Sequence, residues 1–296
     1  MSAARQKKSR PWLFVLLALV VGAAVAVAVA VRGRTSSHPG AANASASAAS
    51  SSSSSTTGDP TNPFASKAMR YYLYHRAGNI TAAAYDADSR TLYLYHPGVA
   101  EATASIMKVD ILATLLHQTQ DAGNGLNSAQ NALAQEMIED SDNDDAQDLW
   151  DEEGGSTAVS DFDADVGMDA TSPNTAGYWG LSTTTARDQV DLLRHVLLPN
   201  HLLDGASRAY ESNLMHNITP SQAWGVSAGI GAGAHVALKN GWLPLAGSDW
   251  QVNSIGAVVG SGRHYLLAVL TTGDPTEGYG IRTISHISSV AWHSLA

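Results

Sequence analysis

The pattern of apolar and polar positions divides the chain into three regions. Residues 12–31 form an apolar run without a charged side chain, and a helix of that length spans roughly 30 Å, the thickness of a bilayer's apolar core. A tract rich in Ser and Ala follows, and it has too few apolar residues to offset the entropy lost on ordering. We therefore expect a transmembrane signal-anchor at 12–31, a disordered linker at 32–63 and a folded domain at 64–296.

Within the folded domain, the periodicity predicts helices in the middle and strands at both ends. Apolar residues recur every three to four positions in 66–76, 105–118 and 183–198, and residues 129–204 are mainly helical in pattern, with breaks near Gly154 and Pro173. Shorter runs predict strands at 80–85, 91–95, 224–228, 235–243, 252–259 and 265–271, before a closing helix at 280–295. This order predicts an α+β fold, an antiparallel sheet flanked by N- and C-terminal helices plus a helical lobe.

Charged residues around the apolar run indicate which side of a membrane each end faces. Four basic residues lie within the first 11 positions, whereas only Arg32 and Arg34 follow the run closely. Because basic flanks stay inside, we expect residues 1–11 to be a cytoplasmic tail and the domain to be extracytoplasmic, held at the cell membrane by a single pass. A cleaved signal peptide is the alternative, since Ala26-Val27-Ala28 fits a cleavage pattern, although the run is long for one. Either interpretation exports the domain, membrane-bound or secreted.

The composition narrows the classes of partner. The first 34 residues hold six of the 17 basic residues and none of the 27 acidic ones, so the remainder has a formal charge of −16. That balance disfavours nucleic acid as a partner. The chain has no cysteine, which excludes disulfides and a lipid anchor through cysteine, and its His residues show no metal-ligand spacing. We expect no metal and no cofactor.

An acidic segment offers one competing interpretation, a calcium loop. Asp140, Asp142 and Asp144 alternate as calcium ligands do. The sixth position of such a loop needs glycine and the twelfth needs glutamate, but those positions here are Asp145 and Asp151. A solvated acidic helix face explains the segment more simply.

Three short motifs carry the candidate chemistry: Ser105-Ile106-Met107-Lys108, Ser141-Asp142-Asn143 and Lys239-Asn240-Gly241. Residues three apart share one face of a helix, so Lys108 is expected beside Ser105, near a helix N-terminus that favours developing negative charge. Apolar neighbours would partly bury Lys108, and burial lowers the pKa of an ammonium group and makes it a usable base. Taken alone, the first two motifs are more simply explained as a helix start and a polar cap, and the third could be an edge-strand feature.

Together and in this order, the motifs resemble the serine β-lactamase and penicillin-binding protein (DD-peptidase) superfamily, and class A β-lactamases in particular. The resemblance extends from about Phe64 to Leu295. It implies a serine hydrolase in which Ser105 is the nucleophile, Lys108 its base and Ser141 a proton carrier. Lys239 would be the cation that holds a substrate carboxylate.

The same resemblance implies a substrate-binding set. Asn143 would orient substrate or Lys108, and Asn240, Gly241 and Trp242 would line the cleft. The backbone N–H groups of Ser105 and Trp242 would form the oxyanion hole. The implied substrates are peptidoglycan peptides or β-lactam-like small molecules.

Three departures from the superfamily's pattern change the expected activity. Asn240 stands where Thr or Ser is usual, so a hydroxyl that contacts a substrate carboxylate is missing. The chain between Lys108 and Ser141 is short, which predicts a trimmed helical lobe. No Glu lies between Gly154 and Thr183, where class A enzymes carry the glutamate that activates the deacylating water. We therefore expect slow deacylation. The alternative is a β-lactamase-fold protein that has lost catalysis and binds cell-wall peptides or a protein partner.

Overall fold

The computed structural model describes residues 61–247 and 249–295. The predicted cytoplasmic tail, signal-anchor and nearly all of the linker lie outside the described residues. Among the residues that are described, no helix is both long enough and apolar enough to cross a membrane.

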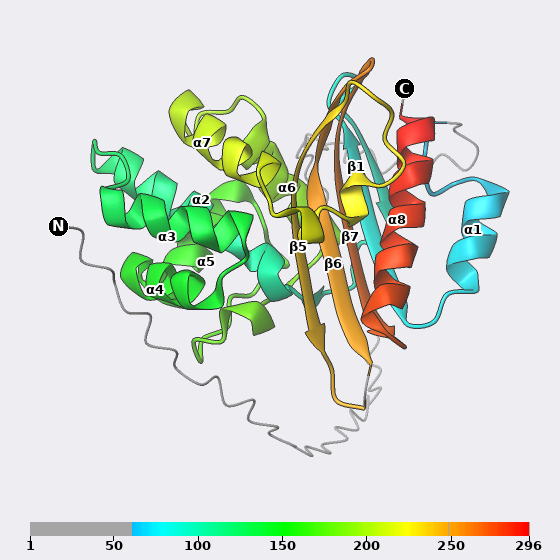
Figure 1. Cartoon of the computed structure of the whole chain (residues 1–296), viewed down its shortest axis with the longest axis horizontal. Coiled ribbons are helices and arrows are strands. Elements are labelled where there is room, and N and C mark those ends of the chain that lie inside the picture. The colour runs from blue at the N-terminus through cyan, green and yellow to red at the C-terminus, as the bar shows by residue number, and fades with distance from the viewer. Residues whose placement is uncertain (1–60, 248, 296) are drawn as a thin grey trace, which may run out of the picture. The chain divides into compact units, whose positions relative to one another are not determined.

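A five-stranded antiparallel sheet forms the centre of the described domain (Figure 1). Its order is β2 (Thr91–Tyr95), β1 (Asn79–Asp86), β7 (Arg263–Asp274), β6 (Trp250–Gly260) and β5 (His235–Pro244). Strands from the two ends of the domain therefore pair, with Ala83 of β1 opposite Ala268 of β7. β5 lies at the edge of the sheet, so alternate N–H groups along it have no partner strand. The predicted α+β fold is confirmed.

Helices cover both faces of this sheet. On one face lie α1 (Lys67–Tyr74) and α8 (Glu277–Ser294), whose buried side chains, such as Leu73 and Ile287, join those of the strands in one apolar core. On the other face, the helical lobe packs around a second core. Its helices are α2 (Met107–Asp121), α3 (Ser128–Glu139), α4 (Asn143–Glu153), α5 (Gly155–Val166), α6 (Ala186–Leu197) and α7 (Gly205–His216).

Local sequence explains where most of these helices begin and end. A polar side chain just before the helix accepts a hydrogen bond from a free N–H group of the first turn. The residues that do so are Ser66, Asn127, Asp142, Thr185, Asp204 and Thr276. Gly154 and Gly167 end α4 and α5 in the left-handed conformation that suits glycine, with φ of +109° and +86°.

The structure differs from the sequence predictions in several places. The short strands β3 (Glu101–Ala102) and β4 (Thr183–Thr184) were not predicted, and β4 occupies the start of the helix expected at 183–198. Residues 224–228, expected as a strand, contain the 3₁₀ helix η4 (Gly225–Ser227). Gly225 has a φ of +79°, and the N–H of Val226 donates to Ser254 Oγ at 3.0 Å, so the backbone turns onto β6 instead of extending. In addition, α7 forms where no separate element was predicted.

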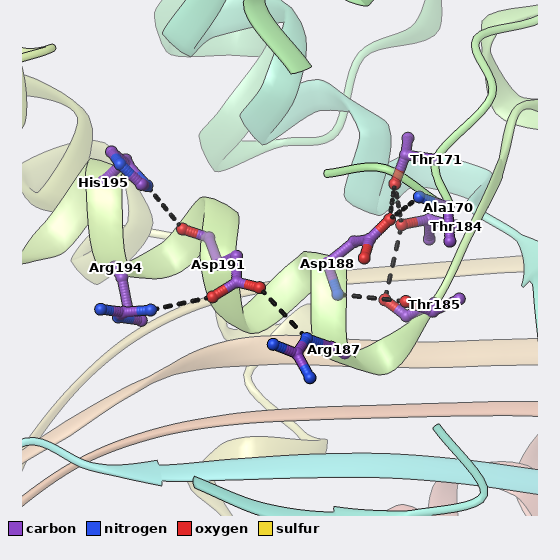
Figure 2. A network of polar contacts seen from close by, with 9 residues as sticks. All are labelled: Ala170, Thr171, Thr184, Thr185, Arg187, Asp188, Asp191, Arg194 and His195. Carbon is purple, nitrogen blue, oxygen red and sulfur yellow. Dashed lines mark hydrogen bonds and ion pairs between the residues drawn. The ribbon is translucent and has the colours of Figure 1, made fainter. Parts of the chain in front are cut away.

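The segment from Gly167 to Thr185 connects α5 to α6 and is tied to the first turn of α6 (Figure 2). Asp188 Oδ2 accepts hydrogen bonds from Ala170 N at 3.0 Å and from Thr171 Oγ1 at 2.8 Å. Thr171 Oγ1 also lies 2.8 Å from Thr184 Oγ1. These bonds fix both ends of a segment that passes close to the serine motif.

Candidate functional site

Ser105 lies where a short strand leads into helix α2. The strand β3 (Glu101–Ala102) pairs with β4 (Thr183–Thr184), and the 3₁₀ turn η1 (Ala104–Ile106) follows it. Ala104 has a φ of +48°, a conformation that costs a non-glycine residue roughly 1–3 kcal/mol and persists only where surrounding contacts hold it. Backbone strain is therefore located one residue before the predicted nucleophile.

Lys108 lies in the first turn of α2 and is fully buried. Its Nζ donates to the carbonyl oxygen of Ser141 at 2.6 Å and to Asn143 Oδ1 at 2.7 Å, and it lies 3.0 Å from Ser141 Oγ, a hydroxyl that can donate to the neutral amine. Ser141 stands at the turn between α3 and α4 with a φ of +59°, in the left-handed region. Lys108 thus joins the serine helix to the Ser141-Asp142-Asn143 turn.

Lys239 reaches the same hydroxyl from the edge of the sheet. Its Nζ donates to Ser141 Oγ at 2.9 Å and to the carbonyl oxygen of Asn240 at 3.3 Å. Like Lys108, Lys239 is fully buried. Because a hydroxyl can both accept and donate, Ser141 Oγ can relay a proton between groups around it. Three of the predicted site residues therefore meet at one oxygen atom.

Burial and mutual repulsion set the protonation of the two lysines. Burial, followed by the charge of Lys239, lowers the pKa of Lys108 to about 6, while Asp142 and Asp145 partly oppose the shift. Burial lowers the pKa of Lys239 to about 7. At neutral pH, Lys108 is therefore mostly unprotonated, as a general base must be, and Lys239 is the more protonated of the two.

Ser105 is half-buried and belongs to the same helix start, three residues before Lys108. Within the described residues, no hydrogen bond joins Ser105 Oγ to Lys108, which is engaged with Ser141 and Asn143 instead. Hydrogen bonds between a nucleophile and its base are often long in a free enzyme and tighten only with substrate. The geometry thus brings Lys108 and Ser141 together, and Ser105 lies on the same helix start as Lys108.

Gly241 explains how β5 approaches Ser105 so closely. A Cβ atom at this position would lie 2.6 Å from Ser105 N and 2.8 Å from Ile106 N, distances that real Cβ atoms do not show against backbone. Only glycine therefore lets the edge strand lie against the serine turn. The next residue, Trp242, is half-buried, and its ring centroid lies 5.8 Å from that of Trp224.

The side chain of Asn240 contacts the backbone that leads into η4. The side chain is buried, and Nδ2 donates to the carbonyl oxygen of Gln222 at 2.6 Å and to that of Trp224 at 3.1 Å. Both amide hydrogens are thus used to hold the backbone that leads into η4. Its assignment to substrate binding stays a prediction.

Trp179 is a residue of this site that the sequence patterns did not reveal. It is buried in the segment between α5 and α6, and its ring centroid lies 4.9 Å from Lys108 Nζ. A ring at that distance favours the charged ammonium, and it also covers Lys108. The segment that lacks a glutamate therefore places an aromatic ring beside the candidate base. In the sequence, Trp179 resembles any core tryptophan, so no local signal marks it.

The acidic segment after Ser141 is helical. Asp142 caps α4 by accepting hydrogen bonds from the N–H groups of Asp144 and Asp145 at 2.8 and 3.0 Å. In the described ranges 61–247 and 249–295, no group of three or more His, Asp or Glu side chains is placed to hold a metal ion. The alternation of aspartates thus reflects a helix cap and an acidic helix face.

Comparison with known proteins supports the fold and the family. A profile of the beta-lactamase enzyme family matches residues 124–295. A candidate lipoprotein named LppW, from Mycobacterium tuberculosis and Mycobacterium bovis, is 28% identical over 181 residues, which cover 57% of this chain and 55% of LppW. The chain thus spans about half the length of the curated relatives it matches.

Solved structures match a larger share of the chain. The TLA-1 extended-spectrum β-lactamase has a TM-score of 0.69 at 16% identity, covering 77% of this chain and 96% of its own. A class A β-lactamase from Bacteroides cellulosilyticus has a TM-score of 0.70 at 16% identity, covering 79% and 98%. PBP-A has a TM-score of 0.67 at 18% identity, covering 76% and 93%. At these identities the likeness shows the fold alone. Because the family profile matches more than half of its length, and because its described domain has this fold, the chain belongs to the beta-lactamase enzyme family.

Proposed function

We propose that this protein is a serine acyl-transfer enzyme of the penicillin-recognising type, with Ser105 as its nucleophile. The observation that carries the proposal is the meeting of Lys108 Nζ and Lys239 Nζ at Ser141 Oγ, at 3.0 and 2.9 Å, in a buried environment. A buried, largely unprotonated lysine next to a serine at a helix start is the arrangement that activates a hydroxyl for attack on a carbonyl.

The proposed reaction assigns one task to each group. Lys108 takes the proton of Ser105, and Ser105 Oγ attacks the carbonyl carbon of an amide or β-lactam. The N–H groups of Ser105 and of Trp242, the latter on the edge strand, stabilise the oxyanion. Ser141 passes a proton to the leaving nitrogen, and the charge on Lys239 favours an anionic substrate. Peptidoglycan peptides and β-lactam-like small molecules carry the bonds that this chemistry cleaves.

We further propose that the acyl-enzyme forms faster than it is hydrolysed. The residues from Gly154 to Thr183 include no Glu, and the ring of Trp179 covers Lys108 on that side. PBP-A has the same fold, and a point mutant of PBP-A has been solved as an acyl-enzyme complex with penicillin G. This likeness supports a long-lived penicilloyl adduct on Ser105.

The proposed location is the outer side of the cell membrane. The apolar run at 12–31, with its basic flank, is the proposed anchor, and the name of LppW describes that relative as a lipoprotein. No cysteine occurs in the 296 residues, so the proposed anchor here is the apolar run.

The experiment that tests the function is covalent labelling by a penicillin, followed by intact-mass measurement. We expect the wild-type protein to gain the mass of one penicillin and to lose it slowly, and Ser105→Ala to gain nothing. Labelling that persists in Ser105→Ala excludes this nucleophile. Absence of labelling in the wild type, with no burst from ester or thioester substrates either, favours the second candidate, a binding protein without catalysis. The amide of Asn240, both of whose hydrogens bind backbone carbonyls, is the observation that favours that alternative.

A further inference from the structure

A side chain from the middle of the sheet holds the backbone that precedes Ser105. Asn253 lies on β6 directly opposite Gly241 of β5, and it is fully buried. Residues paired across two antiparallel strands point to the same face of the sheet. Since a side chain on Gly241 would point at Ser105 N, Asn253 faces the same turn.

Both the nitrogen and the oxygen of the Asn253 side-chain amide form hydrogen bonds. Its Nδ2 donates to the carbonyl oxygen of Ala102 at 2.8 Å and to that of Thr103 at 2.9 Å. Its Oδ1 accepts from Nε2 of Gln251 at 2.9 Å, and Gln251 is buried beside it. This third bond determines which end of the amide is oxygen, so both N–H groups are directed at the two carbonyls.

The two carbonyls belong to the residues just before the strained Ala104. From the other side, the N–H of Thr103 donates to the carbonyl oxygen of Ser182 at 2.8 Å, and Thr103 Oγ1 donates to that of Trp179 at 3.3 Å. The turn is therefore held between β6 and the segment that leads to α6. Because a φ of +48° at alanine persists only where contacts over-determine it, the bonds from Asn253 are part of what keeps Ser105 in place.

We propose that Asn253, oriented by Gln251, is a positioning residue that holds the Thr103–Ser105 turn and so sets the direction in which Ser105 Oγ meets a substrate carbonyl. For its catalytic consequence this inference rests on the proposed function. Asn253 acts through the backbone and not through substrate. Displacing a nucleophile by about 1 Å can cost about 100-fold in rate, so the acylation step should suffer more than substrate binding.

The test compares Asn253→Leu and Gln251→Leu with a matched control, Thr271→Val. Leucine keeps the branched outline of Asn253, with the same number of side-chain heavy atoms, but donates to neither carbonyl. Thr271 is fully buried in the same sheet, opposite Val252, whose side chain belongs to the core that α8 covers. Its Oγ1 lies 2.8 Å from the carbonyl oxygen of Val252 and 2.5 Å from Asp274 Oδ2. The control thus loses buried polar contacts away from the serine turn. Two readouts are used: the acylation rate constant and binding constant for a fluorescein-labelled penicillin, and amide hydrogen exchange of the peptide covering 103–107 without any substrate.

We expect Asn253→Leu to lower the acylation rate constant about tenfold or more, to leave the binding constant within about threefold, and to speed exchange in the 103–107 peptide. Gln251→Leu should act in the same direction with smaller size, and it serves alone if Asn253→Leu does not fold. Thr271→Val should leave both readouts as in the wild type. Unchanged exchange at 103–107 in the Asn253 and Gln251 variants, or an equal change in Thr271→Val, overturns the inference. If the wild type is not acylated at all, the proposed function fails, and hydrogen exchange alone then decides the positioning role.

Discussion

Replacing Asp163 with asparagine should remove a large part of the pH dependence of this protein's stability. Asp163 on α5 and Asp110 on α2 are both buried, they contact each other, and no N–H or O–H group of another described residue donates to either carboxyl. Glu153 of α4, Glu211 of α7 and Asp188 of α6 face this pair and add only negative charge. Without a cation nearby, such a group must retain protons to remain buried.

The size of the effect follows from the pKa of Asp163. Burial is the main cause that raises this pKa to about 7 from an ordinary value of 3.8, the neighbouring Asp110 partly opposes the rise, and the charge of Asp188 adds to it. The folded protein therefore holds a proton that the unfolded chain releases above about pH 4, and the resulting stability is lost as the pH rises to 7. Between pH 5 and pH 8, the free energy of unfolding should fall by about 2–3 kcal/mol through this group alone.

The assay is urea unfolding of the wild type and of Asp163→Asn at several pH values from 5 to 8. As the pH rises from 5 to 8, the free energy of unfolding of the wild type should fall by about 2–3 kcal/mol relative to that of the variant. The exposed Asp161, on the same helix, provides the control Asp161→Asn, for which the difference should stay flat. The pKa values of Lys108 and Lys239 are lowered, so the stability that their neutral forms contribute is lost as the pH falls through about 7 and 6. This contribution is the same in the wild type and the variant, so it cancels in the difference between them. The reasoning would be refuted if the free energies of unfolding of the wild type and of Asp163→Asn differed by the same amount at every pH.

Three further outcomes follow from the site. The rate of acylation by a labelled penicillin should rise with pH through about 6, the pKa of Lys108, and a flat pH profile argues against Lys108 as the base. Lys108→Arg should lose most of this rate, because a guanidinium stays charged. Gly241→Ala should destabilise the protein by about 1–3 kcal/mol in thermal unfolding and should slow acylation, because the added Cβ would lie 2.6 Å from Ser105 N. The control Gly98→Ala, at a position with open space around it, should leave the stability and the acylation rate unchanged. Asp188→Ala should cost about 1–3 kcal/mol and speed proteolysis of the segment between α5 and α6, because Ala170 N and Thr171 Oγ1 lose their acceptor; equal proteolysis of wild type and variant contradicts this.

The elements of this domain were largely predictable because they depend on local chemistry. Apolar spacing locates α1 and α6, and short runs rich in strand-forming residues locate β5, β6 and β7. The one wrong strand, at 224–228, has apolar residues and a glycine that takes a positive φ. Its backbone is bent by a hydrogen bond to Ser254 on a distant strand, which no local pattern contains.

The candidate site divides in the same way. The sequence by itself determined the order of the three motifs, the helical spacing of Ser105 and Lys108, and the absence of a glutamate between Gly154 and Thr183. Each of those features can be read from the order of the residues alone, and the resemblance to the superfamily that they carry implied acyl transfer with slow release.

Only the tertiary structure decided what surrounds these residues. It brought Lys239 to Ser141 through the position of β5, directed the amide of Asn240 to backbone carbonyls, and placed Trp179 against Lys108. It also assigned Asn253 to the serine turn. The physical reason is that burial, pKa and hydrogen-bond partners are set by whichever distant segments pack together, and strand register is a property of the whole sheet.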